Sequence, residues 1–170
     1  MELAPFQTLL DSHGHDVHRF LVANVGADDA DDCYQETWIA ALRAYPQLQH
    51  ATNLRGWLLT IASRKAIDLH RARGRAPIPV AELPEPQASV AGAGTGDAFD
   101  ASEVWDAVQI LPPKQRSAVA MRYLLDAEYQ TIAAAMGTSE PAARRNVYEG
   151  LKRLRAVRAL REEHGDEWIA

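Results

Sequence analysis

Apolar residues recur along most of the chain at the three- and four-residue spacing of amphipathic α-helices. No segment shows the strict alternation and β-branched enrichment of a strand, so the pattern predicts an all-α protein. Residues 76–100 interrupt the pattern with four of the nine prolines and three of the ten glycines. Because both residue types disfavour helix, we expect a flexible linker that joins two small helical domains, residues 1–75 and residues 101–163.

The first domain is expected to hold helices near 4–24, from the acidic run at 28–32 to about Tyr45, and from Leu54 to about Arg73. Acidic residues suit the positive end of the second helix, and Pro46 ends it. The predicted inward stripe of that helix comprises Tyr34, Trp38, Ala41, Leu42 and Tyr45. The third helix is expected to bury Trp57, Leu58, Ile61, Ala62 and Leu69 and to end at Gly74 and Pro77.

The second domain begins with a helix whose expected core residues are Trp105, Val108 and Ile110. After a proline pair, helices are predicted over 114–125 and 128–136, and a long one follows Ser139 to about Glu163. Residues 164–170 form a short acidic tail.

Residues 129–154 have the form of a helix-turn-helix, with Gly137 at the turn and Ser139 as the cap of the second helix. The second helix places Arg144, Arg145 and Tyr148 away from its apolar side. In this motif the second helix enters the major groove, where arginine pairs with guanine edges or phosphate. An ordinary helical hairpin with a basic face would look similar.

Charge is segregated along the chain, although the net charge is −5. Residues 1–36 hold eight acidic residues and one basic residue, whereas residues 55–75 hold six basic residues and one acidic residue. Residues 114–161 hold ten basic residues and four acidic ones. This distribution indicates two surfaces that contact phosphate and other surfaces that do not.

The single cysteine, Cys33, excludes an internal disulfide and favours a cytoplasmic setting. We interpret Cys33 as a packing residue rather than a redox sensor. The N-terminus lacks the features of a signal peptide, and no run of about 20 apolar residues predicts membrane insertion.

Histidines at the start of the chain suggest a second class, a metalloenzyme. His13, His15, Asp16 and His18 lie close in sequence, and zinc sites use such ligands. Only His15 and His18 would share one helix face, and no HExxH motif or glycine-rich phosphate loop is present. We therefore predict no catalytic residue, no metal site and no cofactor.

Three segments together resemble a known family. The run from Asp29 to Trp38, with its Gln35-Glu36 pair, resembles part of region 2 of sigma-70-type RNA polymerase factors. Arg55–Ala62 and the basic run to Arg75 resemble the rest of region 2. Leu111–Arg116 and the helix-turn-helix resemble region 4. The order of the segments and the short chain are similar to the extracytoplasmic-function (ECF) group.

The resemblance implies a factor that binds core RNA polymerase through its β′ clamp helices and its β subunit and directs it to promoter DNA. Residues matching the clamp-binding positions are Asp32, Gln35 and Glu36. For the melted minus-ten strand, the loop over about 44–54 is expected to receive a flipped base, with Gln47, His50 and Asn53 as candidate base contacts. Candidates for contacts to the phosphates of that strand are Arg64, Lys65, Arg71 and Arg73. Candidates for the minus-thirty-five duplex are Ser139, Arg144, Arg145, Tyr148 and Lys152.

The family also implies an anti-sigma partner, and the tether would permit a closed state in which the DNA-binding faces are hidden. The main alternative is a helix-turn-helix DNA-binding regulator that does not dock on polymerase. That alternative explains residues 101–163 and leaves residues 1–75 without a role.

Overall fold

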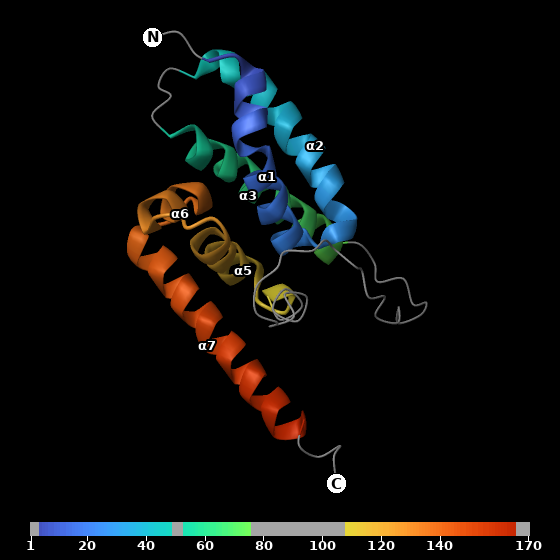
Figure 1. Ribbon diagram of the computed structural model, residues 1–170, viewed down its shortest axis with the longest axis vertical. Coiled ribbons are helices and arrows are strands. Elements are labelled where there is room, and N and C mark those ends of the chain that lie inside the picture. Colours follow the sequence, from blue (N-terminus) through green and yellow to red (C-terminus); the bar gives the residue numbers. More distant parts are fainter. Residues whose placement is uncertain (1–3, 49–52, 76–107, 166–170) are drawn as a thin grey trace.

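The computed structural model describes residues 4–48, 53–75 and 108–165, and regular structure within them is helical (Figure 1). The α-helices are α1 (Phe6–Val25), α2 (Ala27–Ala44), α3 (Leu54–Arg75), α5 (Pro113–Val119), α6 (Tyr129–Met136) and α7 (Glu140–Gly165). A 3₁₀ turn, η1 (Tyr45–Gln47), follows α2, and a π-helical turn, η2 (Ala120–Leu124), continues α5. The all-α class with two helical domains is confirmed.

The first domain is a bundle of α1, α2 and α3, which all pack on one another. Gly26, with a φ of 86°, makes the sharp link between α1 and α2, a conformation that costs glycine little. Asp28 and Asp29 lie in the first turn of α2 and stabilise its positive end. The side chain of Asn53 caps α3, because its Oδ1 accepts a hydrogen bond of 2.7 Å from the Gly56 amide.

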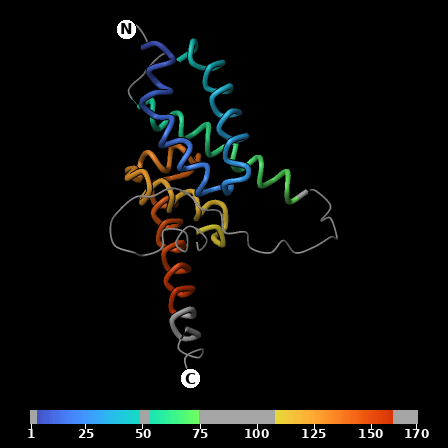
Figure 2. The backbone as a smooth tube through the Cα atoms, turned by 45° about the vertical axis from the view of Figure 1, so that its right-hand side comes forward, coloured from blue at the N-terminus to red at the C-terminus, as the bar shows by residue number. Residues whose placement is uncertain are grey.

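The helix-turn-helix of the second domain forms as the sequence predicts. Gly137 ends α6 in the left-handed conformation, with a φ of 61°. The Ser139 hydroxyl accepts a hydrogen bond of 3.3 Å from the Ala142 amide at the start of α7. Ala143 and Val147 are buried against the domain, whereas α7 extends beyond the rest of the molecule in both views (Figures 1 and 2).

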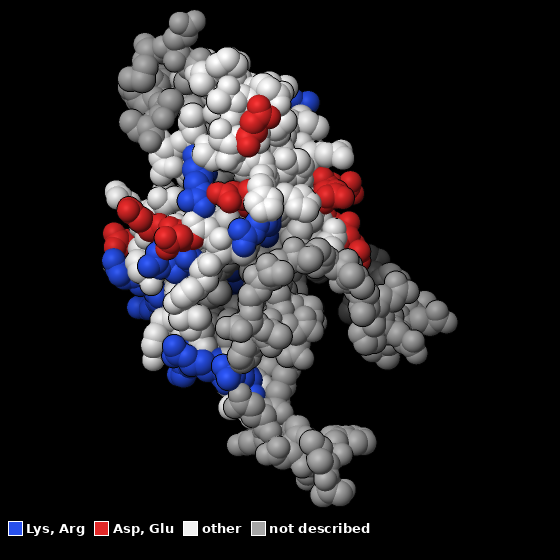
Figure 3. Space-filling model, in the orientation of Figure 1, with Lys and Arg blue, Asp and Glu red and all other residues white. Residues whose placement is uncertain are grey.

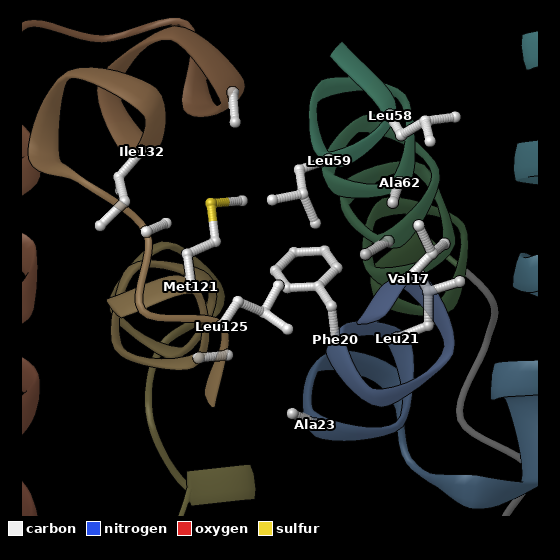
Figure 4. Close-up of a cluster of buried hydrophobic side chains, with 14 of the residues drawn as sticks. Val17, Phe20, Leu21, Ala23, Leu58, Leu59, Ala62, Met121, Leu125 and Ile132 are labelled. Carbon is white, nitrogen blue, oxygen red and sulfur yellow. The ribbon is translucent and has the colours of Figure 1, made fainter. Parts of the chain in front are cut away.

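The two domains lie against each other and share one apolar core (Figure 4). Phe20 of α1 and Leu59 of α3 point toward Met121, with Leu125 and Ile132 beside it, and all five side chains are at most 3% exposed. Phe20 and Leu59 thus bury apolar surface that the first domain alone would leave partly uncovered. Removal of apolar surface from water at about 25 cal/mol per Å² therefore favours the compact arrangement.

Polar contacts add to this interface. The buried Arg116 guanidinium donates to the Asn24 carbonyl oxygen at 2.5 Å, at the carboxyl end of α1. The Ser117 hydroxyl donates to the Asn24 side-chain oxygen at 2.5 Å. Arg55 of α3 donates to the Leu125 carbonyl oxygen at 2.6 Å and pairs with Asp16 at 2.9 Å.

Several predictions about individual positions are wrong. Leu42 and Ile110 were expected in the core, but they are 55% and 61% exposed. Each is one residue from the buried face, since Ala41 and Leu111 take the inward positions. Gly74 does not end the third helix, which runs to Arg75. The helix predicted over 114–125 is regular only to Val119.

The π-helical turn explains that last difference. After Val119 the backbone widens, and the Ala127 amide bonds to the Met121 carbonyl oxygen at 2.9 Å. The wider turn places the Met121 side chain in the interface between the domains, where it is fully buried. The segment closes at Asp126, whose φ of 48° lies in the left-handed region that aspartate tolerates better than most residues.

Other predictions fall outside the described residues: the linker at 76–100, Trp105, His50 and residues 166–170 of the tail. None of the helices in the described part of the chain combines the length and the apolar character that a membrane-spanning segment needs.

Gly150 controls how closely α7 approaches α5. A Cβ atom at this position would lie 2.7 Å from Cγ2 of Val119, which is too close for carbon atoms. We expect Gly150→Ala to lower the free energy of unfolding by about 1–3 kcal/mol through overpacking, despite alanine's better helix propensity. Urea denaturation checks this, with Gly74→Ala, where nothing lies within 4 Å, as a control that does not destabilise. Equal stability of the Gly150→Ala variant would contradict the packing.

Candidate nucleic-acid interface

An exposed stripe runs along α2, on the side away from the core. Asp32, Gln35 and Glu36 are exposed, as clamp-binding residues must be. Ile39 and Leu42, one and two turns further on, are 46% and 55% exposed. Asp32, Gln35, Glu36, Ile39 and Leu42 are called the α2 stripe below.

The sequence interpretation missed the apolar half of the α2 stripe. Ile39 was given no role, and Leu42 was assigned to the core. The sequence spacing could have indicated this stripe, because positions 32, 35, 39 and 42 are three or four residues apart and share one helix face.

The basic residues of α3 lie beside the acidic residues of α2. Lys65 pairs with Glu36 at 3.0 Å, and Arg73 pairs with Asp29. Arg71 lies 3.9 Å from Asp68 on its own helix. Arg64 is exposed, and no ion pair joins it to another described residue. Two of the four predicted minus-ten cations thus carry acidic partners from the helix that bears the α2 stripe.

The loop predicted to hold a flipped base is described only at its ends. Gln47 is exposed. Asn53 is exposed as well, but it caps α3 and its Nδ2 donates to the Thr131 hydroxyl at 3.4 Å. Base contacts by Gln47 and Asn53 stay predictions, and His50 lies outside the described residues.

The second helix of the helix-turn-helix presents one polar face. The residues predicted for the minus-thirty-five duplex, Ser139, Arg144, Arg145, Tyr148 and Lys152, are all exposed. Tyr148 is 61% exposed, so its ring is accessible to a partner. Basic and acidic side chains lie close together over the start of α7 (Figure 3). The pair Glu140–Arg144, at 2.6 Å, belongs to this region.

Contact between the domains leaves these surfaces accessible. The cations of α3 and the polar face of α7 keep at least part of their side chains in solvent. This arrangement does not hide the described DNA-binding side chains, and a closed state that hides them stays a prediction. The contact instead fixes the distance between the two faces.

Burial shifts the pKa of groups near the interface. It lowers the pKa of the Arg116 guanidinium, whose hydrogen-bond acceptors are mainly backbone carbonyls. His70 donates to the Asn24 carbonyl oxygen at 3.0 Å, and burial and then Arg116 lower its pKa. Burial, with Asp29 next, raises the pKa of the Cys33 thiol, which suits a packing residue.

The histidines near the N-terminus take ordinary structural roles. His18 Nε2 lies 3.0 Å from an Asp31 oxygen, and Asp16 pairs with Arg55. Burial, followed by Arg55, lowers the pKa of His13. In the described residues, no group of three or more potential ligands is arranged to hold a metal ion.

Comparisons with known proteins agree on the family. Residues 9–76 match Sigma-70 region 2, and residues 101–154 match Sigma-70 region 4. The chain is 31% identical over 148 residues to the ECF RNA polymerase sigma factor SigD of Mycobacterium tuberculosis, covering 82% of this chain and 70% of SigD. It is 30% identical to the RNA polymerase sigma factor CarQ of Myxococcus xanthus, covering 89% and 88% of the two chains.

Solved structures share the fold. The sigma factor RpoE of Bartonella quintana, in complex with the anti-sigma factor NepR, aligns with a TM-score of 0.71 and 21% identity over 91% of this chain and 96% of its own. CnrH, in complex with the cytosolic domain of CnrY, aligns with a TM-score of 0.66 and 20% identity over 91% and 88%. Together with the identities to SigD and CarQ, the two matched regions show that the chain belongs to the ECF sigma factors of RNA polymerase.

Proposed function

We propose that three exposed surfaces divide the work of this sigma factor between them. The α2 stripe binds the β′ clamp helices of core polymerase, the cations of α3 hold the melted minus-ten strand, and the polar face of α7 contacts the minus-thirty-five duplex. Residues 1–75 and 101–163 act as the two promoter-binding domains, and residues 76–100 connect them. The protein works in the cytoplasm, without a cofactor and without catalysing a reaction.

The α2 stripe carries the proposal. Its five members form one surface that is acidic and polar at one end and apolar at the other. Ile39 and Leu42 leave about half of their surface in solvent and lie next to each other on one helix face, so their exposure favours a partner. A helix-turn-helix regulator that acts without polymerase has no use for this surface.

Polymerase docking and DNA binding are coupled through shared charges. Glu36 belongs to the α2 stripe and also pairs with Lys65, a predicted minus-ten contact. When polymerase engages Glu36, Lys65 becomes available to a phosphate. An exposed pair of this kind contributes at most about 1 kcal/mol, so the exchange is easily made.

Arg64 provides the test of the α3 surface, because it forms no ion pair with an acidic side chain among the described residues. We expect Arg64→Ala to weaken binding of the holoenzyme to a premelted promoter fragment several-fold at physiological salt. Loss of one contact to a single strand should also reduce the slope of log affinity against log salt by about 0.7. Fluorescence titrations at several salt concentrations measure both quantities.

Arg19→Ala is the matched control, since Arg19 is an exposed arginine on α1 outside the three surfaces. An unchanged salt slope for Arg64→Ala, or an equal change for Arg19→Ala, would exclude the assignment of Arg64 to the minus-ten strand.

An anti-sigma partner is part of the proposal. RpoE, which shares the fold, was solved in complex with the anti-sigma factor NepR, and CnrH was solved in complex with the cytosolic domain of CnrY. Melted and duplex promoter DNA occupy separate places on polymerase, so the two domains must part before both are bound. A protein that holds the compact arrangement would therefore inhibit initiation without covering the DNA-binding side chains.

A further inference from the structure

Arg144 is held in place on the free protein, before any DNA arrives. Its Nη2 and Nε atoms both donate to one Glu140 oxygen, at 2.6 and 3.2 Å. Its guanidinium carbon also lies 4.2 Å from the centre of the Tyr129 ring, within the range of a cation–π contact. The side chain is 58% exposed, so the fixed group still faces solvent.

Tyr129 is itself anchored from a second side chain. Arg122 lies 5.3 Å from the centre of the same ring, and its Nη1 donates to the Ala127 carbonyl oxygen at 3.1 Å. Together with Glu128 and Gln130, these side chains line a hollow between the starts of α6 and α7. Tyr129 thereby connects the first helix of the motif to a residue on the second.

The contacts of Arg144 use one edge of its guanidinium group and leave the other edge without a hydrogen bond to a described residue. Glu140 takes the edge formed by Nε and Nη2, and no hydrogen bond joins Nη1 to another described residue. The remaining edge, Nη1 with the second proton of Nη2, is a two-pronged donor. Such a fork fits the O6 and N7 atoms of guanine in the major groove, the commonest specific arginine contact.

Glu140 also changes what Arg144 contributes to affinity. A guanidinium already paired with a carboxylate adds little net positive charge, so it is a poor phosphate contact but a competent base contact. Arg145 and Lys152 lie on the same exposed face, and no ion pair joins them to other described residues. Arg145 and Lys152 therefore suit contacts to the DNA phosphates.

We propose that Arg144 reads a guanine in the minus-thirty-five element, and that Tyr129 and Glu140 are positioning residues that set its geometry. The inference rests on the proposed function, since it requires α7 to bind the minus-thirty-five duplex. It adds a base identity and two residues that act through Arg144 without touching DNA.

In the first experiment, the holoenzyme selects DNA duplexes from a pool in which the minus-thirty-five element is randomised. The selected sequences should contain an invariant guanine. Arg144→Ala should weaken binding roughly five- to a hundredfold and should abolish the preference at that guanine alone. Removing both members of the ion pair, in Arg144→Ala/Glu140→Gln, should leave the salt slope nearly unchanged, whereas Lys152→Ala should lower the slope by about 0.9 and preserve the guanine preference.

The second experiment is a double-mutant cycle with Tyr129→Leu. This change should reduce the guanine preference about two- to tenfold with Arg144 present and should have no further effect in the Arg144→Ala protein. Glu140→Gln should raise the salt slope, because Arg144 regains a full charge. Tyr123→Leu, at a 63% exposed tyrosine of the same domain, is the matched control.

The possible outcomes distinguish failure of the positioning role from failure of the proposed function of α7. If Tyr129→Leu weakens binding equally in both backgrounds, or Arg144→Ala keeps the guanine preference, the positioning role is wrong. If neither Arg144→Ala nor Lys152→Ala alters binding at the minus-thirty-five element, the proposed function of α7 fails as well. Far-UV circular dichroism must show each variant folded.

Discussion

Replacing Leu42 by aspartate is expected to weaken binding of core RNA polymerase by roughly thirty- to a thousandfold. Leu42 is 55% exposed at the apolar end of the α2 stripe. Buried central contacts at interfaces contribute about 2–4 kcal/mol each, and a carboxylate placed there loses its hydration as well. Fluorescence anisotropy of the labelled chain, titrated with core polymerase, measures the change.

The stability of the free protein separates this effect from misfolding. An exposed substitution changes the free energy of unfolding by about 0.5 kcal/mol or less, so Leu42→Asp should unfold like the unmodified chain. Ile110→Asp, at a 61% exposed position outside the α2 stripe, should bind polymerase normally. Normal polymerase affinity in the Leu42→Asp protein would remove the α2 stripe from the interface.

Replacing Leu59 by aspartate is expected to separate the two domains without unfolding them. Leu59 is 1% exposed and points from α3 toward Met121 and Phe20, across the contact between domains (Figure 4). A carboxylate there loses several kcal/mol of solvation, which separation of the domains restores. X-ray scattering should show a larger radius of gyration, while far-UV circular dichroism keeps its helical signal.

The neighbouring residue is the matched control. Leu58 is also buried, at 0% exposure, but it points to the other side of α3, into the first domain (Figure 4). Leu58→Asp should therefore unfold that domain and lose helical signal. A Leu59→Asp protein that stays as compact as the unmodified chain, or unfolds as Leu58→Asp does, would show that the contact is not separable.

Local pattern was enough to predict most of the helices. Gly137, Ser139 and the acidic start of α2 act through neighbours within four residues, so their roles follow from spacing alone. The all-α class and the helix-turn-helix follow from the same short-range rules. Exposure of the candidate side chains on α7 follows too, because Ala143 and Val147 fix which face is inward.

These short-range rules could not predict contacts between segments that are far apart in the sequence. Nothing in the spacing of Asn24 and Arg116 indicates that they meet, yet their hydrogen bond joins the domains. The π-helical turn that buries Met121 looks like ordinary helix in the sequence. Apolar Leu42 and Ile110 were assigned to the core because periodicity cannot separate residues that pack inward from residues exposed for a partner.

Ion pairs and other side-chain contacts within the candidate site were missed because a sequence pattern does not show which side chains meet. Lys65 and Arg73 were counted as cations open to DNA, but α2 supplies each with an acidic partner. Asn53, predicted to contact a base, caps α3. Tyr129 was not singled out, although its ring holds the arginine that the motif places on α7.

The most direct test of the account is transcription in vitro, with the purified chain, core polymerase and fragmented DNA of the source genome. We expect transcripts with discrete starts that core polymerase alone does not make, and these transcripts should disappear when Leu42→Asp replaces the unmodified protein. DNA binding by the chain with no start site gained over core polymerase alone would contradict it. That result would instead indicate a regulator acting without polymerase docking.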